Sequence, residues 1–325
     1  MSSNQRVAIG TVIGTAFLGV LTIWIIAWVG ADAAMKPDPP RDSPFLASYS
    51  FIVQDIEFPA RDATRITGWF IAAAPPPGED PVLHPSPTII LVHSYGGTRD
   101  TMLPAADMFT RAGFHVVIFD ERGTGHSIGA NVTFGALEPL DVLGALDYLL
   151  TRPDVDRSRV GVMGVGLGGS VAIMAASQDD RLRAIAVEAP YASLNASLQD
   201  ALSGQVGLPK LILRPLATRI LLDRIGVPLD DRAPLGAAAK LGTRPVMVIA
   251  DTSGSTEGTE AIYAAVTGPK RLWVAPGTSL GSDATTFSPD YVTHVLGFWR
   301  EVFDPSAPPP LPTGVGPAPA VGPPR

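Results

Sequence analysis

The first feature of the chain is an uninterrupted apolar segment near its N-terminus. Residues 7–31 contain no ionisable side chain, and a helix of this length extends about 37 Å at roughly 1.5 Å per residue. The hydrocarbon core of a bilayer is about 30 Å thick. Trp24 and Trp28 fall toward the second end of the segment, where amphipathic rings favour the headgroup level. We therefore expect one transmembrane anchor, with the lipid bilayer as its partner.

The alternative interpretation of this segment is a secretory signal peptide, because the small residues at 31–33 loosely resemble a cleavage site. The apolar stretch exceeds the roughly 7–15 residues of a signal peptide, which favours retention. Positive charges give little guidance on orientation, since Arg6 precedes the segment and Lys36 and Arg41 follow it. A short N-terminal tail usually stays in the cytoplasm, so we expect the rest of the chain on the extracytoplasmic face.

Beyond the anchor, short apolar runs alternate with longer segments of helical period. Six runs are rich in β-branched residues and almost continuously apolar, which predicts strands buried on both faces of a mostly parallel sheet. Two earlier segments alternate between apolar and polar residues and predict an antiparallel lead-in pair. The predicted strands are, in chain order, 48–58, 64–73, 88–93, 114–120, 159–165, 182–188, 245–250 and 271–275.

The same pattern divides the chain into five parts. A Pro-rich polar spacer follows the anchor, and the Pro, Gly and Ala composition of the C-terminal end predicts disorder. The parts are a short tail at 1–6, the anchor at 7–31, the spacer at 32–47, an α/β domain at 48–304 and the Pro-rich tail at 305–325.

Composition removes several classes of function. The chain has 24 Lys and Arg against 31 Asp and Glu, a net charge of -7, and no basic cluster that could follow a phosphate backbone. Nucleic acid is therefore not an expected partner. The absence of cysteine excludes disulfides, thiolate metal sites and cysteine nucleophiles. The five histidines show no spacing typical of a metal site, so we expect no metal and no cofactor.

Four motifs then occur in a characteristic order. They are LVHSYGG at 91–97, FDERGTGHS at 119–127, a run at 143–176 that contains a G-x-G-x-G turn, and RPVMVIA at 244–250. Over about residues 50–303 the chain resembles the α/β-hydrolase superfamily, particularly its serine esterases and serine-aminopeptidase-like members. The resemblance implies an α/β-hydrolase fold, an eight-stranded mostly parallel sheet with helices on both faces. It also implies a small helical cap, for which 193–240 is the candidate.

The family's catalytic triad is missing from the positions where the resemblance places it. The nucleophile of a G-x-S-x-G elbow would fall at Gly166. The acid after the seventh strand would fall at Gly254, and the histidine after the eighth strand at Leu280. These side chains can neither attack a carbonyl nor accept a proton. We therefore expect a catalytically inactive protein.

Two serines allow an alternative. Ser170 lies about one helical turn past the elbow, and either it or Ser94 would be the relocated nucleophile of an active serine hydrolase that cleaves ester or peptide bonds. Packing or helix capping is the simpler role for Ser170. Asp251 precedes the acid position in a loop where an aspartate typically makes a local turn hydrogen bond. His294, within a helical run, is expected to be a surface or core residue.

The oxyanion site is the part of the family's active-site architecture that the sequence retains. The resemblance implies that the backbone N–H groups of Tyr95 and Leu167 point into the pocket, where such donors favour anions. One hypothesis is thus a small acyl or carboxylate ligand that is bound without being cleaved. The alternative is that the glycines persist only because the bend needs them. A protein partner at the cap or at the Pro-rich tail is a further hypothesis.

Overall fold

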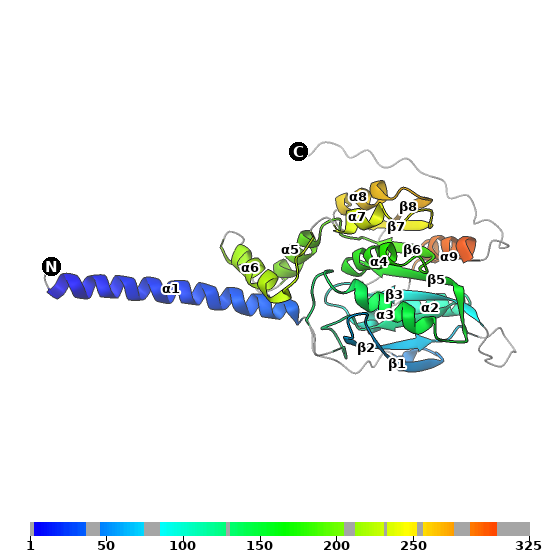
Figure 1. Ribbon diagram of the computed structural model, residues 1–325, viewed down its shortest axis with the longest axis horizontal. Helices are drawn as coiled ribbons and strands as arrows, with labels where there is room; N and C mark the ends of the chain where they lie inside the picture. The colour runs from blue at the N-terminus through cyan, green and yellow to red at the C-terminus, as the bar shows by residue number, and fades with distance from the viewer. Residues whose placement is uncertain are drawn as a thin grey trace.

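The computed structural model describes residues 3–36, 46–74, 85–127, 131–204, 212–230, 233–251, 256–275 and 287–303. An eight-stranded sheet of order β1-β2-β4-β3-β5-β6-β7-β8 forms its centre (Figure 1). The β1–β2 and β2–β4 pairs are antiparallel and the other pairs are parallel. This confirms the predicted sheet and its lead-in pair. The strands are β1 (Val53–Pro59), β2 (Arg65–Ile71), β3 (Ser86–Val92), β4 (His115–Phe119), β5 (Val155–Val165), β6 (Ala184–Glu188), β7 (Val246–Asp251) and β8 (Lys270–Ala275).

Helices cover both faces of the sheet, as the continuous apolar runs require. Every residue of β4 and of β6 is buried, because α2 and α9 pack on one face and α3, α4, α7 and α8 on the other. The helices are α1 (Ser3–Met35), α2 (Leu103–Arg111), α3 (Pro139–Leu149), α4 (Leu167–Gln178), α5 (Leu194–Gly204), α6 (Leu213–Ile225), α7 (Ala233–Ala238), α8 (Glu257–Ala265) and α9 (Pro289–Phe303), with short 3-10 turns η1 (Leu46–Ser48) and η2 (Arg99–Met102).

Helix α1 projects from the domain (Figure 1) and extends past the predicted anchor at both ends. It is long and apolar enough to cross a membrane. Its large apolar side chains are exposed from Val7 to Val29, whereas Ala31, Ala34 and Met35 near its end are buried. The helix therefore has a bare section, in which the large apolar side chains are exposed, and a docked section, which packs against the rest of the protein.

The docked end of α1 packs against α5 and α6, which together form the cap. Helix α7 also falls in the predicted cap region at 193–240, but it packs on α4 within the main layer. The first residues of the predicted spacer belong to α1. The rest of the spacer from 37 to 45 and the predicted disordered tail at 305–325 lie outside the described residues.

Candidate functional site

The turn between β5 and α4 has a sharp bend that only glycine accommodates easily. Gly166 has φ 55° and ψ -120°, in a region that residues with a side chain rarely adopt. Its N–H donates to the Glu188 carbonyl at 2.9 Å. A Cβ atom at Gly164 would overlap the carbonyl of Gly168, and one at Gly168 would overlap the carbonyl of His93. The bend thus accounts for these glycines without any ligand.

The space beside Gly166 is filled by Ser94. A Cβ at Gly166 would overlap the Ser94 hydroxyl oxygen and would lie 3.9 Å from Cε2 of Tyr191. Ser94 belongs to the loop after β3, and its side chain is half-buried. A hydroxyl from a neighbouring loop therefore lies where the side chain of a nucleophile would begin.

Ser170, the other candidate serine, lies inside the protein on α4. It is completely buried. Its Oγ accepts a hydrogen bond from the Tyr191 N–H and donates one to the Tyr191 carbonyl, both at 2.9 Å. This hydroxyl ties α4 to the segment after β6, which favours a packing role over attack on a substrate.

The predicted acid and base positions, Gly254 and Leu280, lie outside the described residues, and so does the side chain of Asp251. The sequence nevertheless limits what these loops can contribute. Residues 276–286 contain no histidine. A base at the usual place would therefore have to come from another part of the chain.

His294 lies on α9, where its Nδ1–H donates to the Asp290 carbonyl at 2.8 Å. Its ring stacks on Trp273 of β8 at a centroid distance of 4.4 Å. The residue is half-buried. Its ring is thus engaged in structural contacts at the edge of α9.

His93 is the histidine next to Ser94, yet it is committed to the backbone. Its Nδ1–H donates to the Ser94 carbonyl at 2.8 Å, and its Nε2 accepts from the Glu121 N–H at 3.2 Å. Burial lowers the pKa of His93, which keeps the ring neutral in this tautomer. Because both ring nitrogens are bonded, His93 supports the loop and does not accept a proton from the Ser94 hydroxyl.

Sequence reasoning missed two carboxylates close to the elbow. Glu188 at the end of β6 is completely buried and accepts a hydrogen bond from the Tyr291 hydroxyl at 2.6 Å. Burial, together with the Glu188 charge, raises the pKa of Tyr291. Asp200 on α5 accepts from the Tyr191 hydroxyl at 2.5 Å. Such pairs come from tertiary packing, and Glu188 and Tyr291 lie 103 residues apart in the chain, so no local motif announces them.

The two predicted backbone donors flank the elbow. Leu167 begins α4 and is buried, and Tyr95 follows Ser94. The Tyr95 ring stacks on Phe134 at 5.3 Å, and its hydroxyl donates to the Ala34 carbonyl at 2.9 Å. The loop that carries Ser94 and Tyr95 is therefore joined to the docked end of α1.

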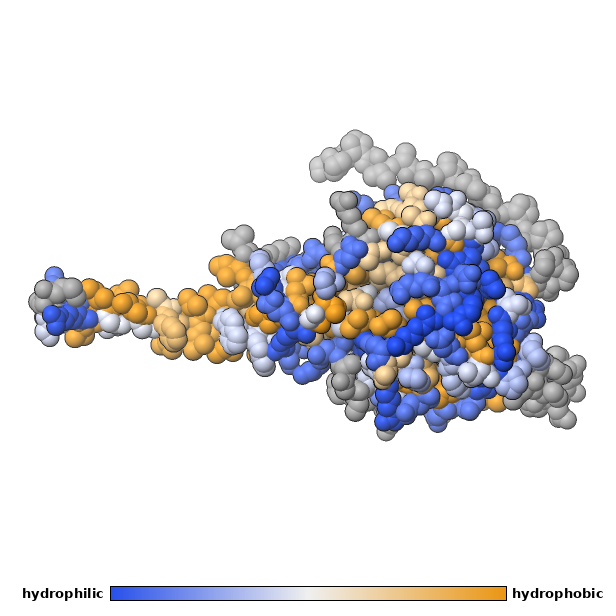
Figure 2. All heavy atoms as spheres, viewed as in Figure 1, coloured by the Kyte–Doolittle hydropathy of each residue, from blue (hydrophilic) through white to orange (hydrophobic). Residues whose placement is uncertain are grey.

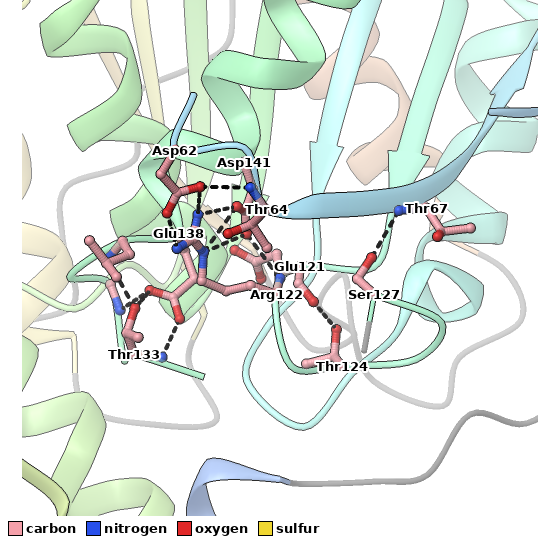
Figure 3. A network of polar contacts seen from close by, with 12 residues as sticks. Asp62, Thr64, Thr67, Glu121, Arg122, Thr124, Ser127, Thr133, Glu138 and Asp141 are labelled. Atoms are coloured by element: carbon pink, nitrogen blue, oxygen red, sulfur yellow. Dashed lines mark hydrogen bonds and ion pairs between the residues drawn. The ribbon is translucent and has the colours of Figure 1, made fainter. Parts of the chain in front are cut away.

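A network of polar contacts holds the segment after β4 (Figure 3). The buried guanidinium of Arg122 binds Asp141 at 2.6 Å and Asp62 at 2.7 Å. Burial raises the pKa of Asp62, but the hydrogen bonds from Arg122 and Thr64 together outweigh burial and lower that pKa to about 2. The carboxylate of Asp120 accepts hydrogen bonds from the Arg99 and His126 N–H groups. Through these contacts Asp120 and Arg122 brace this loop.

Glu138 fixes the next part of the same segment (Figure 3). Its carboxylate accepts hydrogen bonds from the Thr133 N–H at 2.5 Å, the Thr133 hydroxyl at 2.6 Å and the Gly135 N–H at 2.8 Å. The bonds surround Phe134, which has a φ of 54°. The Val132 N–H donates to the Met35 carbonyl at 3.2 Å. The braced segment thus supports both the Tyr95 ring and the end of α1.

Comparisons with known proteins match this architecture. Residues 74–211, less than half of the chain, match the family model of the X-Pro dipeptidyl-peptidases (S15 family). The chain is 31% identical to the uncharacterized protein YfhR of Escherichia coli O157:H7 over 142 residues, which are 43% of this chain and 48% of that protein. The matched region therefore spans about half the length of this relative.

Two solved structures show the likeness of fold. The Pyrococcus furiosus esterase Pf2001 has a TM-score of 0.63 at 21% identity, covering 82% of this chain and 97% of the esterase. The Pyrococcus horikoshii acylaminoacyl peptidase has a TM-score of 0.57 at 17% identity, covering 79% of this chain and 43% of the peptidase. At these identities the likeness concerns the fold alone.

Proposed function

We propose that the chain is a membrane-anchored member of the α/β-hydrolase superfamily that binds a small acyl or carboxylate ligand without hydrolysing it. One observation carries the proposal. Gly166 keeps the conformation of a nucleophile elbow, while the Ser94 hydroxyl fills the place of the missing side chain.

The absence of hydrolysis follows from what a serine nucleophile needs. A serine hydroxyl is a weak nucleophile until an adjacent base takes its proton. Gly166 has no hydroxyl, the Ser170 hydroxyl is bonded to Tyr191, and both ring nitrogens of His93 are bonded to backbone. If the described residues supply no paired nucleophile and base, only the small rate supplied by binding and backbone donors remains.

Ligand binding is supported by the donors around the elbow. The N–H groups of Tyr95 and Leu167 lie on the two segments that meet at Gly166, and the N-terminus of α4 favours a negative group. The names of the similar proteins, a dipeptidyl-peptidase, an esterase and an acylaminoacyl peptidase, all refer to acyl chemistry. An acyl or carboxylate ligand therefore matches both the backbone donors at the elbow and the chemistry named for the similar proteins.

Ligand-observed NMR of the full chain in detergent micelles tests this binding with two probes of equal chain length. Octanoate carries the carboxylate and octanol does not. We expect saturation transfer to octanoate that octanol fails to displace, because the backbone donors select the anion. Equal binding of both probes, or of neither, would contradict an anion-selecting site.

Membrane anchoring is part of the same proposal, with the domain on the extracytoplasmic face. Its support is the bare apolar section of α1 from Val7 to Val29. Vesicle flotation and protease protection test the anchor and its orientation. Release of the chain as a shorter, soluble protein would show a cleaved signal peptide.

A second candidate function is favoured by one observation. The Ser94 hydroxyl lies at the elbow beside the proposed donor of Leu167, so a serine hydrolase acting through Ser94 is the enzymatic alternative. Such an enzyme needs a base from outside residues 276–286, which contain no histidine. Labelling of Ser94 by a serine-reactive probe would establish this alternative.

A further inference from the structure

The last turns of α1 are built into the cap. Ala27 and Ala31 are completely buried in the cluster that α1 forms with α5 and α6. Arg224 of α6 binds Asp32 at 2.8 Å, and its guanidinium lies 4.5 Å from the centre of the Trp28 ring. Apolar packing and an ion pair therefore hold α6 beside α1.

This junction sets the height of the cap above a bilayer. The exposed apolar side chains of α1 run from Val7 to Val29, which is about 33 Å of helix at roughly 1.5 Å per residue. The hydrocarbon core is about 30 Å thick. Burial against the cap begins at Ala27. The cap thus starts where the hydrocarbon ends, at the level of the headgroups.

The exposed side of the cap carries both apolar and basic groups. Ile212, next to the start of α6, is 57% exposed, and Figure 2 shows apolar surface on the cap close to the base of α1. A groove of about 540 Å³ lies between α5 and α6. Its lining residues, all in the described part of the chain, include two arginines and no carboxylate: Gln199, Arg214, Pro215, Thr218, Arg219 and Leu222.

The two arginines have unused hydrogen-bonding capacity. Nε of Arg214 is buried and, within the described residues, has no hydrogen-bond partner. Arg219 makes an ion pair with Asp223 at 3.2 Å, but both side chains are more than half exposed, and such pairs are weak. Guanidinium groups bind phosphate through paired N–H donors. Phosphate is the anion that lies at the height of this groove in a bilayer.

From this geometry we infer that the outer face of α6 rests on an anionic membrane surface, with Arg214 and Arg219 bound to lipid phosphates. The inference rests on the proposed anchoring by α1. The chain has a net charge of -7, so an anionic surface repels it except where cations gather. Two arginines at the surface favour the docked orientation about 30-fold, since each contributes a factor of roughly five. Docking would fix the orientation of the elbow relative to the membrane.

The chain offers a clean probe because it contains no cysteine. Ile212→Cys provides a single thiol for an environment-sensitive fluorophore on the full chain. The labelled protein is placed in nanodiscs of phosphatidylcholine, with or without about 30% phosphatidylglycerol, that carry headgroup spin labels. We expect strong quenching with phosphatidylglycerol and several-fold weaker quenching after Arg214→Gln/Arg219→Gln.

A matched control removes two exposed arginines from the parts of the sheet remote from the cap. Arg65→Gln/Arg157→Gln changes the net charge equally, and Arg65 and Arg157 lie at the starts of β2 and β5. This variant should leave the quenching unchanged. If it reduces quenching as much as the cap variant does, the effect is one of net charge and the inference is wrong.

Vesicle flotation separates failure of the docking from failure of the anchor. A chain that floats with vesicles but shows no quenching is anchored and has a cap that stands away from the lipid or meets a protein partner, which overturns the inference. Equal quenching in both lipids shows apolar contact without phosphate binding and overturns the role of the arginines. A chain that does not float overturns the anchoring and the docking together.

Discussion

The elbow makes a sharp prediction for the substitution Gly166→Ala. The new methyl group would sit at a φ of 55° and would overlap the Ser94 hydroxyl oxygen. Both effects destabilise the folded state, and only the second depends on Ser94. Replacement of Ser94 by alanine should therefore rescue part of the damage.

The magnitudes follow from the two contributions. The sparsely populated conformation of Gly166, φ 55° and ψ -120°, costs about 1–3 kcal/mol for a residue with a side chain, and overpacking adds about 1–3 kcal/mol. Gly166→Ala should thus lower the free energy of unfolding by about 2–6 kcal/mol. Ser94→Ala alone removes one hydroxyl and should cost within about 1 kcal/mol. The double variant should retain only the conformational cost.

Urea unfolding of the full chain in detergent micelles, followed by near-UV circular dichroism, measures the four corners of this cycle. Gly236→Ala is a control, since Gly236 lies in α7 with no atom within 4 Å of an added Cβ, and helix propensity predicts a slight gain. We expect a coupling energy of about 1–3 kcal/mol between the two sites. Additive costs would refute the view that Ser94 fills the nucleophile's place.

Three further substitutions test the supports of the site. Asp62→Asn should cost about 1 kcal/mol at pH 7. The contacts with Arg122 and Thr64 lower the pKa of Asp62 to about 2, so the ionised carboxylate contributes stability that is fully present above the unfolded pKa and is lost as pH falls through 2. Urea unfolding between pH 7 and 2 should show the two proteins converge. Ala31→Leu should cost about 1–3 kcal/mol by overpacking the α1–cap contact, whereas Ala16→Leu on the exposed section should change thermal stability little. Glu138→Ala leaves three donors unpaired and should cost about 2–4 kcal/mol; a thermal unfolding temperature equal to that of the wild type would exclude this bracing role.

The sheet could be predicted from the sequence because its strands are buried on both faces. β4 and β6 are buried at every residue, and continuous apolar runs report such burial directly. The end of α1 could not be predicted in this way. The chain remains helical through Asp32 to Met35 because α6 packs on it and Arg224 pairs with Asp32. From local composition alone, these residues are predicted to be a polar spacer.

The features of the functional site also fall into those that local sequence predicts and those that tertiary contacts determine. The G-x-G-x-G motif announces the bend, and Gly164 and Gly168 are needed for its close backbone contacts. The motif does not predict which side chain lies beside Gly166, because Ser94 reaches the elbow from another loop. The pairing of Glu188 with Tyr291 is equally a product of tertiary packing. Local sequence thus predicts the backbone bend of the site. The side chains around the bend depend on contacts between residues that are far apart in the sequence.

The central claim is that the elbow has lost its nucleophile. Fluorophosphonate labelling of the full chain in detergent micelles tests it most directly, with Ser94→Ala and the rebuilt variant Gly166→Ser/Ser94→Gly/Gly254→Asp/Leu280→His measured in parallel. We expect no labelling of the wild type, since no serine at the elbow contacts a base within the described residues, and labelling of the rebuilt variant. Wild-type labelling that disappears in Ser94→Ala would contradict the claim and identify an active serine hydrolase.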